Sequence, residues 1–304
     1  MKKALMLAFL LAVSCTLSFA YGTQYAITEA NYEYEIVEQE NKTLYLHNNS
    51  GEYILNTTKG SSEETTNYTI NTDAYRAWTQ KPSFAGSFNI VNICTAHLFI
   101  EPINDGAYWP DVTVNMTYND DTWLDTETIG DISTTSWYNF TLHIDRSAVI
   151  VHYNKNITLN ISASSEGGAP SIKVYYDSAT RDSRLNLTTS TYVDVDWIKT
   201  YNGGIETSEF GVLDVITVKA NISDPIGSYD ITEAKITIRD PNGDDVVTNA
   251  TMTLEQIDPS DPSAWKRFTY DAGPYGTTGT YSVFVFGHES NGVSSYKTTT
   301  FTVS

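Results

Sequence analysis

Apolar and polar residues alternate one by one along much of the chain, and this is its dominant pattern. The alternation is clear in residues 112–118, 157–161 and 192–198, where every second residue is apolar. Such a period of two predicts strands with one face in a core and the other in water. Clusters of Gly, Asn and Pro separate these segments, and the spacing of a long amphipathic helix is almost absent. The sequence therefore predicts an all-β protein made of β-sandwiches.

Changes in composition divide the chain into predicted domains. Residues 32–37 and 43–46 are candidate hairpin strands, and the polar segment 59–66 is a candidate linker. Asn202-Gly203-Gly204 is the candidate boundary between two strand-rich regions. The predicted organisation is a signal peptide at 1–20, an N-terminal β segment and linker at 21–67, a jelly-roll-like β-sandwich at 68–202 and an immunoglobulin-like β-sandwich at 205–304.

The first residues have the pattern of a secretory signal peptide. Lys2 and Lys3 precede an apolar run at 4–13, and Ser18 and Ala20 are the small residues of a cleavage site. We therefore expect an extracellular or cell-surface protein. A lipoprotein, with its lipid on Cys15, is the alternative.

No second long apolar stretch follows that segment, and the chain ends on a candidate strand at 296–303. We therefore expect a protein that is not integral to the membrane. Removal of the signal peptide would leave Cys94 without a disulfide partner, and its place in a strand-like run predicts a small buried apolar residue.

The second predicted domain carries a family resemblance. Residues 224–231 contain Asp-Pro-Ile-Gly and lead into a strand that ends at Asp240-Pro241-Asn242-Gly243, and Gly279-Thr280-Tyr281-Ser282-Val283 begins a later strand. These motifs resemble the immunoglobulin-like repeats of secreted archaeal and bacterial cell-surface proteins. The resemblance implies a sandwich that serves as a spacer or contact surface.

The first predicted domain has a fainter resemblance. Residues 172–176 precede Asp177-Ser178 and, later, Ser183-Arg184-Leu185. This order resembles secreted jelly-roll modules of the galactose-binding type over about a third of the domain. The resemblance transfers no binding residue.

Acidic residues outnumber basic ones by 37 to 18, which gives a formal net charge of −19. A surface this acidic repels phosphate backbones, and no basic stripe is present, so nucleic acid is excluded as a partner. The charge instead favours solubility and attraction of cations.

Acceptor motifs for N-glycosylation, Asn-x-Ser/Thr, are about twice as frequent as chance predicts. Their polar asparagines alternate with core residues, so strands would present them to solvent. The alternative is that Thr-rich strands create these motifs incidentally. The candidate glycosylation sites are Asn41, Asn48, Asn56, Asn67, Asn115, Asn139, Asn156, Asn160, Asn186, Asn221 and Asn249.

The catalytic motifs that we considered are absent from the sequence or incomplete in it. The chain has no Gly-x-Ser-x-Gly elbow to expose a nucleophilic serine, and Gly292 stands where a zinc protease motif beginning at His288-Glu289 needs its second histidine. The five histidines have no metal-ligand spacing. We therefore expect a protein that is not an enzyme.

Two groups of residues are candidate binding sites. Asp120, Asp121 and Asp125 surround Trp123 and are either solvated acids or oxygen ligands of a structural Ca²⁺, the one cofactor we consider. Trp109 and Trp123 are the tryptophans most expected to face solvent, where they could stack on a sugar ring.

Together these patterns predict a secreted, N-glycosylated, non-catalytic cell-surface or extracellular protein with a structural or adhesion role. Its expected partners are other cell-envelope proteins or glycans, with self-association as a further mode. The alternative is a carbohydrate-binding module protein whose jelly roll is the sugar receptor. A secreted hydrolase is the third, less favoured, interpretation.

Overall fold

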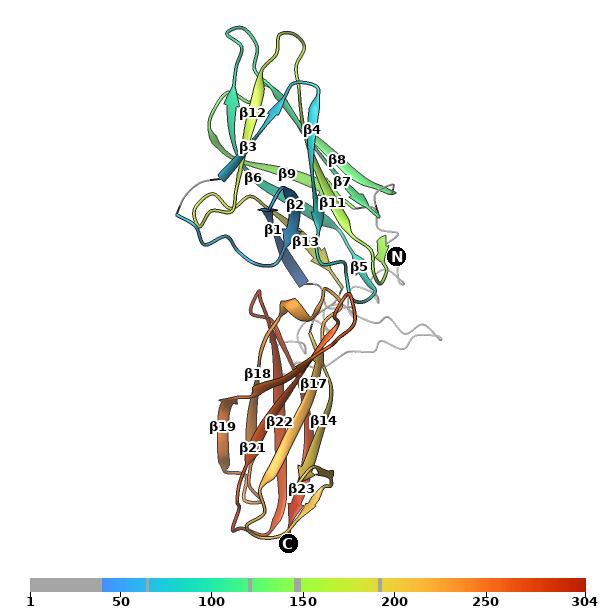
Figure 1. Ribbon diagram of the computed structural model, residues 1–304, viewed down its shortest axis with the longest axis vertical. Coiled ribbons are helices and arrows are strands. Elements are labelled where there is room, and N and C mark those ends of the chain that lie inside the picture. Colours follow the sequence, from blue (N-terminus) through green and yellow to red (C-terminus); the bar gives the residue numbers. More distant parts are fainter. Residues whose placement is uncertain (1–39, 64–65, 120–121, 145–148, 191–192) are drawn as a thin grey trace, which may run out of the picture. The chain divides into compact units, whose positions relative to one another are not determined.

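The computed structural model describes residues 40–63, 66–119, 122–144, 149–190 and 193–304. Strands dominate these residues, and the helical content of the described part is the single 3-10 turn η1 (Ser228–Asp230). This confirms the all-β class. Residues Gln39–Ser304 form one compact unit, which contains two packed β-sandwiches (Figure 1).

The first sandwich has a large sheet and a small one facing each other. The large sheet runs β3-β12-β6-β13-β1-β2-β4, with β9, β5 and β10 attached, and the small sheet runs β11-β7-β8. The strands are β1 Glu40–Asn49, β2 Glu52–Asn56, β3 Thr66–Asn71, β4 Ala74–Gln80, β5 Phe88–Ile90, β6 Ile93–Ile103, β7 Asp111–Tyr118, β8 Thr122–Ile129, β9 Ser136–His143, β10 Val149–Val151, β11 Ile157–Ser164, β12 Ser171–Tyr176 and β13 Arg184–Thr189.

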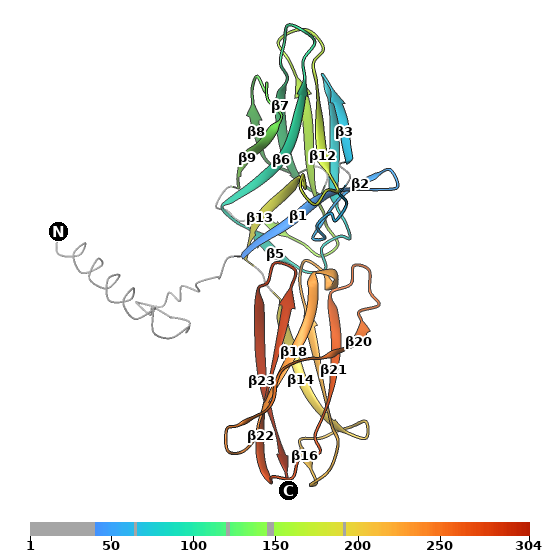
Figure 2. The ribbon, with the colours of Figure 1, turned by 90° about the vertical axis from the view of Figure 1, so that its left-hand side faces the viewer.

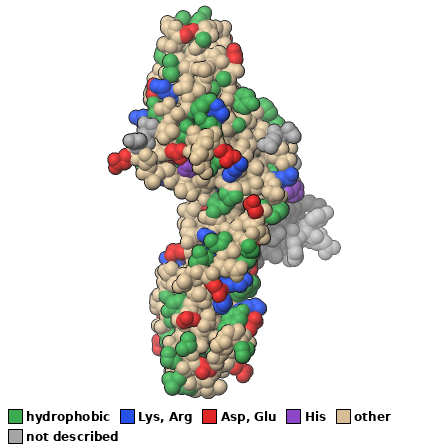
Figure 3. All heavy atoms as spheres, in the orientation of Figure 1, with side chains coloured by type: hydrophobic (Ala, Val, Ile, Leu, Met, Phe, Trp, Pro, Cys, Tyr) green, Lys and Arg blue, Asp and Glu red, His purple; other side chains and the backbone are tan. Residues whose placement is uncertain are grey.

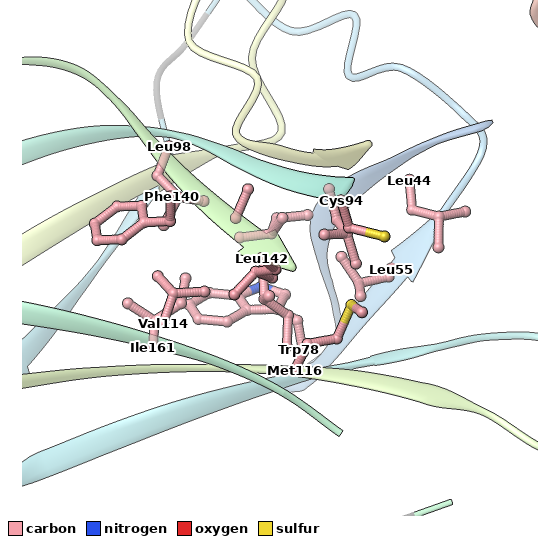
Figure 4. Packing of buried hydrophobic residues seen from close by; sticks show 14 of the residues in the cluster. Leu44, Leu55, Trp78, Cys94, Leu98, Val114, Met116, Phe140, Leu142 and Ile161 are labelled. Carbon is pink, nitrogen blue, oxygen red and sulfur yellow. The ribbon is translucent and has the colours of Figure 1, made fainter. Parts of the chain in front are cut away.

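The predicted alternation is realised in the core of this sandwich. In β7, Val112, Val114 and Met116 are buried while the residues between them are partly exposed. Trp78 is fully buried, and its ring meets that of Tyr53 edge-on with centroids 5.4 Å apart. Figure 4 shows Trp78 and Met116 among the aliphatic side chains. Apolar burial of this kind is the main stabilising contribution to a sandwich.

Cys94 lies in the same core, as its strand-like surroundings predict. Its side chain is fully buried, and burial raises the pKa of its thiol to about 11 (Figure 4). A thiol with such a pKa stays protonated and inert at neutral pH.

The second sandwich packs two five-stranded sheets, β15-β14-β17-β21-β20 and β16-β23-β22-β18-β19 (Figure 2). Its core includes stacked rings of Tyr281 and Phe301, with centroids 5.0 Å apart. The strands are β14 Asp194–Asn202, β15 Ile205–Glu206, β16 Glu209–Phe210, β17 Ile216–Ser223, β18 Ile231–Arg239, β19 Asp245–Thr251, β20 Thr253–Ile257, β21 Trp265–Ala272, β22 Gly279–Glu289 and β23 Ser294–Val303. The jelly-roll and immunoglobulin-like assignments stay predictions.

The predicted domain boundary at Asn202-Gly203-Gly204 is wrong. Strand β14, which precedes it, pairs with β17 and belongs to the second sandwich. Gly203 and Gly204 form the two-residue turn between β14 and β15, with φ of 56° and 88°. A tight hairpin of this type needs positive φ at both positions, so two glycines mark a turn as readily as a linker.

The predicted N-terminal segment at 21–67 is also divided differently. Strand β1 lies between β13 and β2 in the large sheet, so its residues are part of the first sandwich. Ser62, in the predicted linker, forms a bridge with Ser178. The predicted strand at 32–37 and the signal peptide at 1–20 lie outside the described residues. Across the described ranges, no helix is long and apolar enough to cross a membrane.

We expect the Trp78→Ala substitution to lower the free energy of unfolding by about 3–5 kcal/mol, because it removes a fully buried ring and leaves a cavity. Trp123→Ala is the matched control: that ring is 61% exposed, so its loss should change stability by less than about 0.5 kcal/mol. Urea unfolding followed by circular dichroism measures both. Equal effects of the two substitutions would contradict this packing.

Candidate functional site

The candidate glycosylation sites differ in how far the structure exposes them. All eleven asparagines lie within the described ranges. Exposed ones are Asn41, Asn67, Asn139 and Asn249; half-buried ones are Asn48, Asn56, Asn115, Asn156, Asn160 and Asn186. Glycosylation of these ten residues stays a prediction.

Asn221 differs from the other ten because its side chain is buried and hydrogen-bonded within the protein. It is 7% exposed, and its Nδ2 donates a hydrogen bond to Asp196 Oδ2 at 2.8 Å. Ser223, the hydroxyl residue of the same motif, donates to Asp196 Oδ1 at 2.6 Å. A glycan is attached at Nδ2, which is the atom that this hydrogen bond engages in the folded protein.

The predicted calcium ligands are only partly visible. Asp120 and Asp121 lie outside the described residues. Asp125, on β8, accepts a hydrogen bond from the backbone N–H of His143 at 2.6 Å. One of its oxygens therefore already serves to connect β8 with β9, and calcium binding there stays a prediction.

The two candidate sugar-stacking tryptophans are not brought together. Trp123 pairs with Thr117 near the end of β7, whereas Trp109 precedes the first residue of that strand. At about 3.3 Å per residue, the strand separates them by roughly 20 Å or more. A single sugar ring cannot stack on both.

Trp109 instead lines a pocket among three loops of the first sandwich. The pocket has a volume of about 180 Å³, and acidic and aromatic side chains dominate its wall. Its lining residues are Ala107, Tyr108, Trp109, Asp111, Asp131, Ser165 and Glu166. Rings beside carboxylates are a combination that can bind a sugar through stacking and hydroxyl hydrogen bonds.

Two carboxylates hold the loops around this pocket. Asp105 accepts the backbone N–H of Tyr108 and that of Ala169, at 3.0 and 2.8 Å, and these bonds lower the pKa of its carboxyl. Asp111 Oδ1 accepts the N–H of Asp131 at 2.8 Å. The pocket wall is therefore fixed by charge-assisted hydrogen bonds rather than by apolar packing.

A second concentration of charge, which sequence reasoning missed, lies where the two sandwiches meet. We call Lys42, Glu40, Asp224, Asp230 and Glu289 the Lys42 cluster. Lys42 Nζ lies 2.7 Å from Asp230 Oδ2, 3.3 Å from Glu40 Oε1 and 3.7 Å from Asp224 Oδ2, and it contacts Glu289 Oε2 directly. Lys42 and Glu40 come from β1, and the other three carboxylates come from the second sandwich.

All five side chains of this cluster are buried; the most exposed, that of Glu40, retains 8% of its surface. Burial raises the pKa of Glu289 to about 10, helped by its contact with Glu40, and burial also raises the pKa of Asp224. Burial opposes the charge of Lys42, but Asp224, Asp230 and Glu289 outweigh it and raise the pKa of Lys42. The cluster therefore favours the ammonium form of Lys42, while burial favours the protonated form of the carboxyls of Glu289 and Asp224.

Within the described residues, Asp224, Asp230 and Glu289 are the group whose oxygens come within 4.8 Å of one another, as metal ligands do. The ammonium of Lys42 lies among these oxygens and already supplies a positive charge there. The arrangement is thus a buried ion cluster that joins the two sandwiches.

Other contacts surround this cluster at the junction, the region where the sandwiches meet. The backbone N–H groups of Ala85 and Gly86 both donate to Pro225 O at 2.9 Å. Ile226, from the second sandwich, is fully buried in the core cluster of the first. Gln80 Nε2 donates to Tyr229 OH at 3.1 Å. Apolar and polar contacts therefore both connect the sandwiches.

One sequence signal could have revealed the cluster. The alternation of β1 puts Lys42 on the same face as Leu44 and Leu46, which are core residues. A lysine on the core face of a strand needs a buried anionic partner. The partners themselves are far away in the sequence and had no signal.

No family model matches the chain. Among solved structures, an aminopeptidase from a marine sediment Thaumarchaeota archaeon is similar with 8% identity and a TM-score of 0.41, over 53% of this chain and 39% of that one. A CocE/NonD family hydrolase from Staphylococcus aureus matches with 11% identity and a TM-score of 0.39, over 50% of this chain and 37% of that one.

A DUF4785 family protein from Legionella pneumophila matches with 10% identity and a TM-score of 0.25, over 80% of this chain and 65% of that one. The alignments with the archaeal aminopeptidase and the staphylococcal hydrolase cover well under two thirds of those proteins. Their activities carry no argument for this chain.

We expect Asn221 to remain unmodified in protein from a glycosylating host. Trypsin releases it in peptide 220–235, and it releases the exposed Asn249 in peptide 240–266, so the two sites are compared within one sandwich. Mass spectrometry should find a glycan on the second peptide and none on the first. A glycan on Asn221 would show that modification precedes the folding of β17.

Proposed function

We propose that the protein is a secreted, N-glycosylated, non-catalytic component of the cell surface, with a structural or adhesion role. The observation that carries the proposal is the junction. Two sandwiches connected by a buried ion cluster and by Ile226 belong to one compact unit. Such a unit suits a spacer that presents contact surfaces to other cell-envelope proteins or glycans.

The distribution of charge supports this role. On the face shown in Figure 3, acidic and basic side chains are interspersed among uncharged ones. With a net charge of −19, neighbouring copies repel one another weakly at long range, and salt screens that repulsion. Contacts at the surface would then depend on polar groups and bridging cations.

We expect the native protein in the cell-envelope or culture fraction, released by a chelator or high salt without detergent. Protease added to intact cells should digest it, while a cytoplasmic marker protein stays whole. The physical reason is that contacts between acidic surfaces through cations are reversible. Recovery with the cytoplasmic marker, or a requirement for detergent, would contradict the proposal.

A carbohydrate-binding role is the second candidate, and the loop pocket favours it. Trp109 and Tyr108 lie beside Asp111, Asp131 and Glu166 in that pocket. Aromatic rings can stack on the C–H face of a sugar while carboxylates accept hydrogen bonds from its hydroxyl groups. The ligand would be a neutral sugar, because the carboxylates repel anionic ones.

A glycan array tests this second role. We expect the protein to bind a neutral sugar. The Trp109→Ala substitution should lower the affinity for that sugar at least tenfold, which corresponds to about 1.4 kcal/mol of stacking energy. Trp123→Ala is the matched control, an exposed tryptophan outside the pocket, and should bind as the parent does. Absence of any saturable neutral-sugar ligand would exclude the carbohydrate-binding role and leave the structural one.

A further inference from the structure

The Lys42 cluster has the components of a chemical reaction as well as those of an ion pair. An amine and a carboxylic acid condense to an amide when the amine is neutral, the acid is protonated and water is scarce. Lys42 Nζ is in direct contact with the carboxyl of Glu289, and the side chains of both are at most 1% exposed. Two reactants held in contact gain an effective concentration far above any in solution.

The cluster favours the protonation state that the condensation needs at Glu289, and it places a proton acceptor beside Lys42. Burial, helped by the contact with Glu40, raises the pKa of Glu289, which favours its carboxylic acid form over the carboxylate. The neighbouring carboxyls raise the pKa of Lys42 and so favour its ammonium form, which is not a nucleophile until it loses a proton. Asp230 Oδ2, 2.7 Å from Nζ, is placed to take that proton.

We propose that Lys42 and Glu289 become joined by an amide bond within the folded protein, with Asp230 as the proton carrier. Asp230 removes a proton from the Lys42 ammonium, and the neutral Nζ attacks Cδ of the protonated Glu289 carboxyl. The C–N bond forms, the C–O bond to the hydroxyl breaks, and a proton lost from Nζ goes to the leaving hydroxyl. The products are the amide, one water molecule and protonated Asp230, with no change in net charge and no oxidant or other reactant.

The environment favours the product. The reaction converts a buried ammonium and a buried carboxylate into a neutral amide and a neutral acid, which removes the cost of keeping those charges away from water. The excluded solvent also slows hydrolysis of the new bond. The bond would connect β1 with the last residue of β22, and therefore one sandwich with the other.

A tryptic digest of the folded full chain, made in a bacterial host without N-glycosylation, tests the bond. An amide on Lys42 prevents cleavage after it, so the N-terminal peptide should run on to Lys59. Mass spectrometry should find that peptide joined to peptide 268–297, which contains Glu289, with the combined mass lower by one water.

Two variants complete the experiment. Lys42→Arg keeps the positive charge without an amine that can condense, so peptide 268–297 should appear free. Lys173→Arg alters an ion pair with Glu101 on the outer face of the large sheet, and it should keep the linked species at the parental yield. Free peptides 43–59 and 268–297 from the folded parent, or Lys42 joined instead to peptide 220–235, would overturn the proposal.

Discussion

The charge of Lys42 is the constraint on which the arrangement of the two sandwiches depends. An ammonium group without solvent costs several kcal/mol unless anionic groups surround it. Glu40, on the same strand, supplies one carboxyl beside the ammonium, and the other three carboxyls come from the second sandwich. If the first sandwich buried this strand face alone, Glu40 would be the one carboxyl among these four that remains beside the ammonium of Lys42. Its stability and the position of the second sandwich are linked through one side chain.

Packing and hydrogen bonds around the cluster follow from the same constraint. Water must be kept away from the ions for their attraction to be strong, and Ile226 closes the first core beside them. The backbone bonds from Ala85 and Gly86 to Pro225 O hold the segment that carries Asp224 and Asp230. Removal of one member of such a cluster is strongly destabilising, because it leaves an uncompensated charge or polar group away from water.

The sequence predicted the class of fold because period-two alternation depends only on neighbouring residues. It predicted the buried state of Cys94 for the same reason. It misplaced the boundary at Gly203-Gly204, since a hairpin turn and a linker share that composition. The sequence could not predict the Lys42 cluster, because Asp224, Asp230 and Glu289 come together only after strands far apart in the sequence have paired. Trp109 was identified as a candidate, but the pocket around it depends on three loops.

The position of Ile226 in the core of the first sandwich affects the order in which the two sandwiches are completed during synthesis. Strand β1 pairs with β13, so the first sandwich cannot close its large sheet until most of its chain has been made. Even then one core position stays open until the chain reaches Ile226. A nascent chain of this kind gains its full stability late, because local contacts alone do not complete either core. The timing of completion is thus governed by a residue of the second sandwich.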